Sequence, residues 1–166
     1  MIKNVRLIFI LLLATSIFSV SFIGMDSHVE GLSVGDKAPN FTLYENKGHD
    51  MNLKMLQGNW ILISFWASYD ASSRIQNATL NHVVGEVGNR VKMVSVSFDY
   101  YESIFNEVIK QYEISSENCY LARVDRSSEL YKTYKIGKGF RNYLLNEKGE
   151  IVAKDITSSQ LKAYFN

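Results

Sequence analysis

Few side chains of this protein can do nucleophilic, redox or metal chemistry, and they lie far apart in the sequence. The 166 residues include one Cys, Cys119, and three His: His28, His49 and His82. A single Cys excludes an intrachain disulfide, a Cys-rich zinc site and a dithiol redox pair within the chain. The His residues lack the spacing of metal ligands, so we expect no metal and no other cofactor.

Hydroxyl and carboxylate side chains concentrate in residues 68–74, which read SYDASSR. The Ser hydroxyls have no base nearby in the sequence, and His82 stays open only as a distant candidate. Asp70 and Ser73 suit the start of a helix, because both accept hydrogen bonds from first-turn N–H groups. The alternative is a functional site that repels anions or forms hydrogen bonds. We expect Arg74 to be solvated rather than catalytic.

Composition limits the class of protein. With 46% hydrophobic and 13% aromatic residues, the chain can build the core of one domain, and disorder is not expected. The formal net charge of +1 gives no electrostatic support for binding nucleic acid.

Residues 1–24 are expected to be a signal peptide or an N-terminal membrane anchor. Two basic residues precede an almost wholly apolar run, and small residues follow it. Cleavage after Ser21 or Gly24 is one interpretation. The other is an uncleaved anchor, because Leu7–Ile23 has the minimum length of a membrane-spanning helix. We therefore expect export to the periplasm or cell envelope.

Two continuous apolar runs, residues 60–66 and 91–98, fit strands that are buried on both faces of a central sheet. A helix is expected between them, capped by Ser72 or Ser73 and ended by Gly88. Its expected apolar positions are Ile75, Ala78, Leu80, Val83, Val84 and Val87.

Shorter elements are expected on either side of these runs. They are a strand at 39–43, a turn at 46–48, a helical turn at 53–56, a helix from Ser103, a short strand within 119–125, a short helix capped by Ser127 or Ser128, a hairpin over 141–154 and a final helix capped by Ser158 or Ser159. The inner face of the helix from Ser103 is expected to carry Ile104, Phe105, Val108, Ile109 and Tyr112. This order predicts an α/β fold, a three-layer α/β/α sandwich with a mixed central sheet.

Four segments carry a resemblance to a known family. Residues 34–43 read VGDKAPNFTL, like the entry motif GxxAPxFxL, and residues 56–68 resemble a strand that leads to an active site. Residues 94–99 and 134–152 resemble the second core strand and a later strand–turn–strand. Together they resemble the thioredoxin fold and, more closely, exported TlpA/ResA-like thiol–disulfide oxidoreductases of the redoxin (AhpC/TSA) type. The resemblance implies a thioredoxin-like domain over residues 33–166.

The chain departs from this family at the residues that define its chemistry. The family has Cys-x-Pro-Cys-Arg at the start of a helix; here Asp70, Ser72 and Ser73 replace the first Cys, the Pro and the second Cys. The family's cis-proline, counted back from Tyr143, corresponds to Phe140. We expect a trans peptide bond and a reshaped loop there, because non-Pro cis bonds cost about 2.5–4 kcal/mol.

These replacements remove thiol–disulfide exchange. That reaction needs a thiolate at a helix N-terminus and a second thiol that resolves the mixed disulfide. Asp70 is not a useful nucleophile toward sulfur, and Ser73 cannot form a disulfide. We therefore expect a pseudo-enzyme with a degenerate active site, acting as a non-catalytic protein- or peptide-binding module.

A protein or peptide partner is expected at the former active-site face. The candidate contacts are Trp66, Tyr69, Asp70, Ser73, Gly139 and Phe140. Tyr100, Tyr101 and Tyr143 are expected near the same end of the sheet and would enrich it in aromatic surface. The alternative is that most of these aromatic residues belong to the core or its rim. No nucleic acid is expected, and membrane contact only through an uncleaved N-terminal segment.

Two other functions stay open. One is a residual thiol redox protein, of oxidoreductase or antioxidant type, that acts through Cys119 or a partner thiol. Cys119 lies well downstream of the former active-site helix, which favours a bystander, with intermolecular pairing as the remaining possibility. The other is a purely structural subunit.

Overall fold

A computed structural model describes residues 29–44 and 50–165. The expected leader, residues 1–24, and the expected turn at residues 46–48 lie outside these ranges. Within the described ranges, no helix is both long enough and apolar enough to cross a bilayer.

Five strands form the central sheet, in the order β5-β4-β3-β6-β7. Their bounds are β3 (Ile61–Trp66), β4 (Lys92–Ser97), β5 (Cys119–Leu121), β6 (Asn142–Leu145) and β7 (Ile151–Lys154). β4 pairs in parallel with β3 and β5, whereas β6 pairs antiparallel with β3 and β7. The mixed sheet is therefore confirmed. All residues of β3 are buried, as expected for a central strand covered on both faces.

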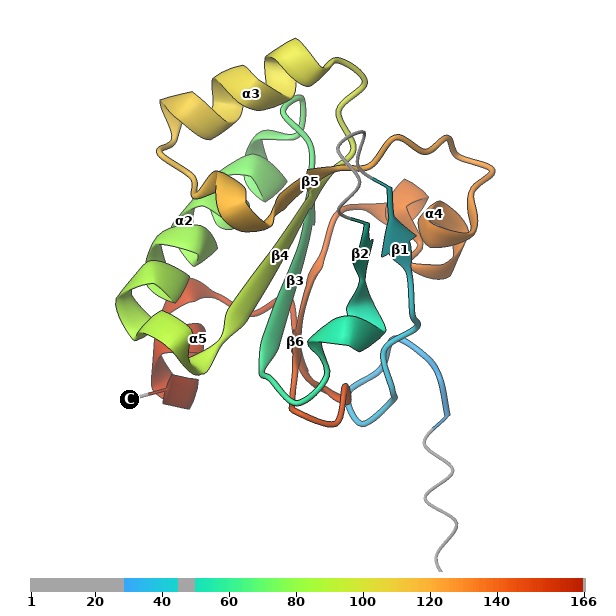
Figure 1. Ribbon diagram of the computed structural model, residues 1–166, viewed down its shortest axis with the longest axis vertical. Helices are drawn as coiled ribbons and strands as arrows, with labels where there is room; N and C mark the ends of the chain where they lie inside the picture. Colours follow the sequence, from blue (N-terminus) through green and yellow to red (C-terminus); the bar gives the residue numbers. More distant parts are fainter. Residues whose placement is uncertain (1–28, 45–49, 166) are drawn as a thin grey trace, which may run out of the picture.

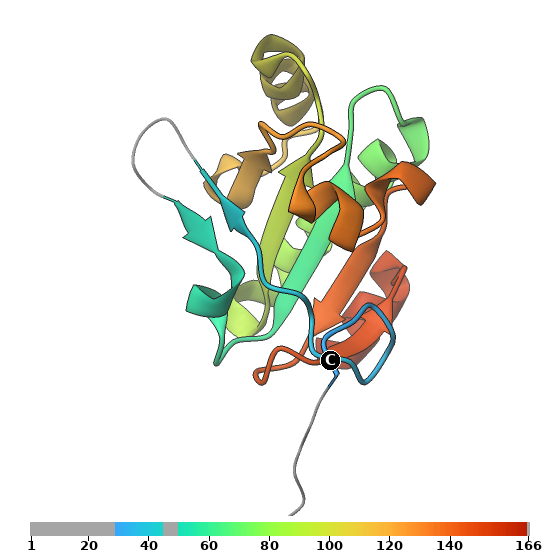
Figure 2. The ribbon, with the colours of Figure 1, turned by 90° about the vertical axis from the view of Figure 1, so that its right-hand side faces the viewer.

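The helices and a small second sheet form the two outer layers (Figure 1). The helices are α2 (Ala71–Val87), α3 (Glu102–Gln111), α4 (Glu129–Thr133) and α5 (Ser158–Phe165). α2 and α5 lie on one face of the central sheet, and α4 lies on the other. On the α4 side, β1 (Thr42–Leu43) pairs antiparallel with β2 (Met51–Asn52), and the expected helical turn follows as a 3₁₀ segment, Leu53–Leu56. Figure 2 shows this small sheet in front of the central strands. The three-layer arrangement is confirmed.

The central sheet separates two apolar cores, because successive side chains of a strand point to opposite faces. Ile61, Ile63 and Phe65 of β3 enter the core on the α4 side. Leu62 enters the core on the other side, where α2 and α5 pack together through residues such as Leu80 and Leu161.

Two helices bury fewer of their expected apolar residues than the pattern predicts. In α2, Ser73 and Asn77 occupy the buried stripe, whereas Ile75, expected on the apolar side, is 54% exposed. In α3, only Val108 is fully buried, because this helix lies at the end of the sheet rather than across its face (Figure 1). Ile104, also expected to face inward, is 45% exposed.

Helix caps also differ from the expectations. Ser128 caps α4 as expected, by accepting a hydrogen bond from Tyr131 N at 3.3 Å. α5 is instead preceded by a capping box, in which Thr157 N donates to Gln160 Oε1 at 2.9 Å and Gln160 N donates to Thr157 Oγ1 at 3.4 Å. The residue that precedes α3 is Tyr101, whose side chain forms no capping hydrogen bond.

Substitution of two isoleucines, one buried in the core and one exposed on a helix, tests the described burial. We expect Ile63→Ala to lower the free energy of unfolding by about 2–5 kcal/mol, because Ile63 is completely buried in β3. Ile75→Ala, at an exposed position of α2, is the matched control and should change it by less than about 1 kcal/mol. Urea denaturation followed by circular dichroism measures both. If Ile63→Ala does not fold, Ile63→Val should cost about 0.5–1.5 kcal/mol. Equal effects of the two Ala variants would contradict the described burial.

Candidate functional site

The carboxyl ends of the parallel strands β3 and β4 lie at one edge of the central sheet. A short loop, residues 67–70, connects β3 to α2 at this edge, and residues 98–101 connect β4 to α3. Ligands of open α/β sheets commonly bind outside the carboxyl ends of their strands. The edge therefore gathers most of the candidate residues.

Asp70 and Ser73 close the first turn of α2 by bonding to one another. Asp70 is the N-cap residue, and its Oδ1 accepts a hydrogen bond from Ser73 N at 2.8 Å. Ser73 Oγ donates to the carbonyl of Asp70 at 3.2 Å and accepts from Ala67 N at 3.4 Å. The cap is thus Asp70 rather than Ser72 or Ser73. A carboxylate one residue before a helix reaches the third N–H of the first turn, as this geometry requires.

Asp99 joins the two strand ends through its buried carboxylate. Oδ1 accepts from Ser68 N at 2.9 Å and from Ser68 Oγ at 2.5 Å, and Oδ2 accepts from Ser97 Oγ at 2.7 Å. Asp99 is only 6% exposed, so these donors compensate a charge removed from water. This carboxylate was not among the candidate residues. The signal that would have found it is an acidic residue directly after a buried parallel strand.

Trp66 lies beneath this edge rather than on its surface. Its side chain is completely buried and stacks on Phe105, with 6.0 Å between ring centroids. Trp66 Nε1 donates to Ser95 Oγ at 2.8 Å, and Ser95 Oγ donates to Asn77 Oδ1 at 2.9 Å. Trp66 therefore cannot be a surface contact, and Ser73, at 6% exposed, is withdrawn in the same way.

Arg74 is not the solvated side chain that we expected. It is half-buried, and its Nη1 donates to the carbonyl oxygen of Ser68. Its guanidinium carbon lies 5.6 Å from the ring centroid of Tyr112, within the range of a cation–π contact. Arg74 thus connects the loop before α2 to Tyr112, the residue that follows α3.

Gly139 and Phe140 precede β6, and Phe140 lies next to Tyr69 and Phe98 at this edge of the sheet. None of the described residues has a cis peptide bond, so the expected trans bond before Phe140 is confirmed. Gly139 has a φ of 119°, a conformation that favours glycine. Phe140 is half-buried, and its ring centroid lies 6.1 Å from that of Tyr69 and 6.0 Å from that of Phe98.

An open cleft of about 550 Å³ lies between the loop after β3, the loop after β4, the start of α3, residues 124–126 and α4. Its lining residues are Ser68, Tyr69, Phe98, Asp99, Tyr100, Tyr101, Ile104, Val124, Asp125, Arg126 and Tyr131. We call it the aromatic cleft. Three of its Tyr side chains project far into solvent: Tyr69 is 74% exposed, Tyr100 89% and Tyr101 60%. Partial burial and the nearby Asp99 carboxylate raise the pKa of Tyr69 above its usual value, so its hydroxyl is a neutral donor at pH 7.

Tyr143 does not belong to this surface. It is 1% exposed, lies opposite Ile63 in the β3–β6 pairing and packs in the core on the α4 side. Of the candidate contacts, only Tyr69 lines the aromatic cleft. Asp70, Gly139 and Phe140 are not fully buried but lie outside its lining. The lining residues that sequence reasoning missed include, besides Asp99, Phe98 and Tyr131, whose ring centroids lie 6.0 Å apart.

Cys119 is buried on the edge strand β5, directly opposite Ser95 of β4. Its Sγ donates to the carbonyl oxygen of Ser115 at 3.2 Å. Burial raises the pKa of the thiol to about 11, against a weaker opposing effect from a hydrogen bond with Ser95. Since thiolates rather than thiols attack disulfides, the raised pKa leaves little of Cys119 in the reactive form at neutral pH.

In the part of the chain that the structure describes, no group of three or more His, Cys, Asp or Glu side chains is placed to hold a metal ion. His82 is exposed and lies 3.3 Å from Glu86. His28 and His49 lie outside the described ranges.

Comparison with known proteins identifies a matching family and several relatives. The model of the AhpC/TSA family matches residues 34–154. The thiol-disulfide oxidoreductase ResA of Bacillus cereus is 23% identical to this chain, over 96% of this chain and 92% of the relative. ResA of Bacillus subtilis is 22% identical, over 98% and 89%.

Solved structures agree with this relationship. A thioredoxin-like protein from Parabacteroides distasonis has a TM-score of 0.70 and 33% identity, over 82% of this chain and 97% of that chain. A thiol-disulfide oxidoreductase from Bacteroides fragilis has a TM-score of 0.65 and 27% identity, over 78% and 96%. The thioredoxin-like fold is therefore shared with proteins of redox function, whereas this chain has a single Cys.

The capping role of Asp70 can be measured directly. We expect Asp70→Ala to lower the free energy of unfolding by about 1 kcal/mol, because the N–H of Ser73 loses its acceptor. Asp70→Asn is the matched control and should stay within about 0.5 kcal/mol of the original chain, since Asn caps helices as well as Asp. Urea denaturation gives both values. An Asp70→Ala variant as stable as the original chain would contradict the capping role of Asp70.

The reactivity of Cys119 gives a second test. With a pKa of about 11, roughly one thiol in a thousand is ionised at pH 8. We expect iodoacetamide to alkylate the folded protein at least about 100-fold more slowly than the urea-unfolded chain. The rate should rise as the pH rises from 8 to 10, because the thiolate fraction grows while the protein stays folded. Mass spectrometry measures the extent of alkylation, and equal rates in the folded and unfolded chains would contradict burial.

Proposed function

The chain belongs to the AhpC/TSA family, and from that premise we propose that it is an exported, non-catalytic member whose former active-site face binds a polypeptide. Loss of catalysis is supported by three residues. Asp70 and Ser73 stand at the positions of the family's two cysteines and bond to one another. Cys119 is buried with a raised pKa.

The exposed aromatic side chains of the cleft carry the binding proposal. Tyr69, Tyr100 and Tyr101 present large apolar rings to water, and Ile104 and Val124 add aliphatic surface beside them. A contiguous exposed apolar patch is typical of an interaction surface. Tyr in particular contributes contact area with little loss of conformational entropy, and its hydroxyl supplies a hydrogen bond at the rim.

Ring contacts and hydrogen bonds connect the residues at the base of the cleft, and a preformed binding face has a lower entropic cost of binding. Phe98 contacts both Tyr131 and Phe140, with 6.0 Å between the ring centroids in each pair. Asp99 fixes the loop at Ser68 by two hydrogen bonds. The three exposed Tyr side chains thus project from a fixed floor, as expected of a preformed binding face.

An apolar polypeptide suits this cleft better than other ligand classes. Asp99, Asp125 and Arg126 are its only ionisable lining residues besides Tyr, within the described part of the chain. Two acidic side chains thus outnumber one basic side chain, and phosphate-rich nucleic acid finds no net positive surface. The cleft is open rather than enclosed, whereas small-molecule sites usually bury most of their ligand. An extended peptide with apolar side chains can lie along it and cover the rings.

Export is part of the proposal and rests on the sequence of residues 1–24. A short basic start, an apolar run and small residues support delivery to the periplasm or cell envelope. Membrane contact would then depend only on whether this segment is retained. The redox alternative is disfavoured, because a buried thiol must first be exposed before it can react with a partner.

Peptide binding by paired variants tests the proposal. Peptides selected from a random library against the full-length chain are expected to be apolar and to bind the aromatic cleft. The double variant Tyr69→Ala/Tyr101→Ala should weaken their dissociation constants at least about tenfold, since truncating a central aromatic contact commonly costs more than about 1 kcal/mol. Tyr164→Ala, at a 47% exposed Tyr of α5, is the matched control and should bind like the original chain. Fluorescence anisotropy measures the constants.

Two outcomes would contradict the proposal. If the control variant weakened peptide binding as much as the double variant, or if the double variant did not weaken it, the cleft would not be the binding site. An insulin-reduction assay addresses catalysis separately. Turnover that survives Cys119→Ala would refute the claim that the protein is not an oxidoreductase.

A further inference from the structure

A second cavity, of about 280 Å³, shares none of its lining residues with the aromatic cleft. It lies between residues 32–33, the residues that follow α4, and the β6–β7 hairpin. Four of its lining side chains are cationic: Lys135, Lys138, Arg141 and Lys154. No acidic residue of the described chain lines it. We call it the basic cavity.

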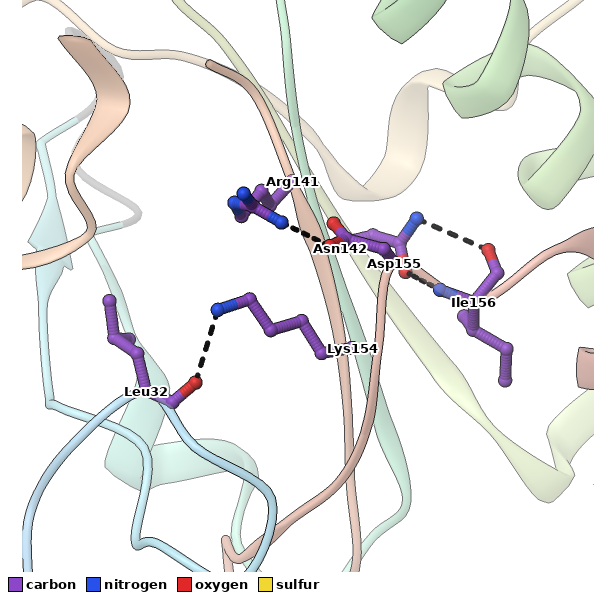
Figure 3. Close-up of polar contacts among 6 residues, drawn as sticks. All are labelled: Leu32, Arg141, Asn142, Lys154, Asp155 and Ile156. Carbon is purple, nitrogen blue, oxygen red and sulfur yellow. Dashed lines mark hydrogen bonds and ion pairs between the residues drawn. The ribbon is translucent and has the colours of Figure 1, made fainter. Parts of the chain in front are cut away.

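The hairpin places three of the lining residues on one face. Arg141 and Tyr143 are two residues apart along the same strand direction, and Lys154 lies directly opposite Tyr143 in the β6–β7 pairing. The Nζ of Lys154 lies 5.6 Å from the ring centroid of Tyr143 and donates to the carbonyl oxygen of Leu32 at 3.4 Å. Figure 3 shows Arg141 and Lys154 extending to the same side of the hairpin.

The positive charge of the basic cavity is only partly compensated. Arg141 forms an ion pair with Asp155, which lies outside the lining (Figure 3). Lys135 and Lys138 form no ion pair with any described residue, and Lys154 bonds only to a neutral carbonyl. Like charges held close together repel, so an anion that enters the cavity is attracted by several cations at once.

One lining residue, Tyr143, has a buried hydroxyl that lacks a hydrogen-bond partner. Tyr143 is 1% exposed, and its hydroxyl bonds to no described residue. The neighbouring hydroxyl of Tyr134 already donates to the carbonyl oxygen of Pro39 at 2.5 Å. Buried polar groups normally have hydrogen-bond partners, so the unpartnered Tyr143 hydroxyl is available to a ligand. Burial raises the pKa of Tyr143 although Arg141 acts to lower it, which keeps the hydroxyl a donor at neutral pH.

We propose that the basic cavity binds a phosphate-type oxyanion, either the free ion or the phosphate group of a small monoester. A tetrahedral dianion accepts hydrogen bonds in several directions, so it can meet the lysine ammonium groups and the Tyr143 hydroxyl together. Lysines bind phosphate as flexible point charges, which suits Lys135 and Lys138 at the exposed rim. The small volume favours a compact ligand over a nucleotide.

Titration of the full-length chain with inorganic phosphate tests this site. Isothermal titration calorimetry at pH 7.5 and constant ionic strength should give one saturable site. Lys135→Ala/Lys138→Ala should weaken binding at least tenfold. Tyr143→Phe should weaken it at least threefold without lowering the apo melting temperature, because the hydroxyl bonds to no described residue. Lys110→Ala, in the last turn of α3, is the control and should bind phosphate like the original chain.

Other anions decide the ligand class. Saturable binding of glycerol 3-phosphate, tighter than that of phosphate, would support a monoester, and equal or weaker binding would support the free ion. Succinate binding as tight as phosphate binding would overturn the assignment to a tetrahedral oxyanion. Absence of saturation, or equal affinity in every variant, would overturn the site itself. None of these variants touches the aromatic cleft, so failure here leaves the peptide-binding proposal to its own test.

Discussion

The hydrogen bonds of the Asp99 carboxylate are the constraint on which the site depends. They connect the end of β4 to Ser68, at the start of the loop before α2. A buried carboxylate is stable only with several donors, so the positions of Ser68 and Ser97 are tied to it. Tyr69 follows Ser68 directly, and Tyr100 follows Asp99. The two exposed rings thus take their places from one buried charge.

Structural hydrogen bonds occupy the places where the family has redox groups. At the helix N-terminus, Asp70 and Ser73 bond to one another where two thiols would react. Behind them, a polar chain from Trp66 through Ser95 to Asn77 runs between β3, β4 and α2. A helix N-terminus that would stabilise a thiolate stabilises an N-cap carboxylate equally well. The helix N-terminus is therefore satisfied without the two thiols.

The two candidate surfaces differ in chemistry but share one segment of chain. Tyr131 of α4 supports the aromatic cleft, whereas Tyr134, Lys135 and Lys138, just beyond it, line the basic cavity. Phe140 then lies beside Tyr69 of the cleft, with 6.1 Å between the ring centroids, before β6 begins. The segment that carries the cis-proline in the family thus separates an apolar surface from a cationic one.

Local pattern was sufficient for most of the secondary structure and for the replacement of the family's two cysteines. The apolar runs of β3 and β4, the hairpin of β6 and β7, and Asp70 and Ser73 in place of cysteines all follow from neighbouring residues. Contacts across long sequence separations were decided only by the tertiary structure. Ser68 and Asp99 are 31 residues apart, and the partners of Trp66, Arg74 and Tyr143 come from other elements. Burial of a polar or aromatic side chain depends on what packs over it, and periodicity within one element cannot report that.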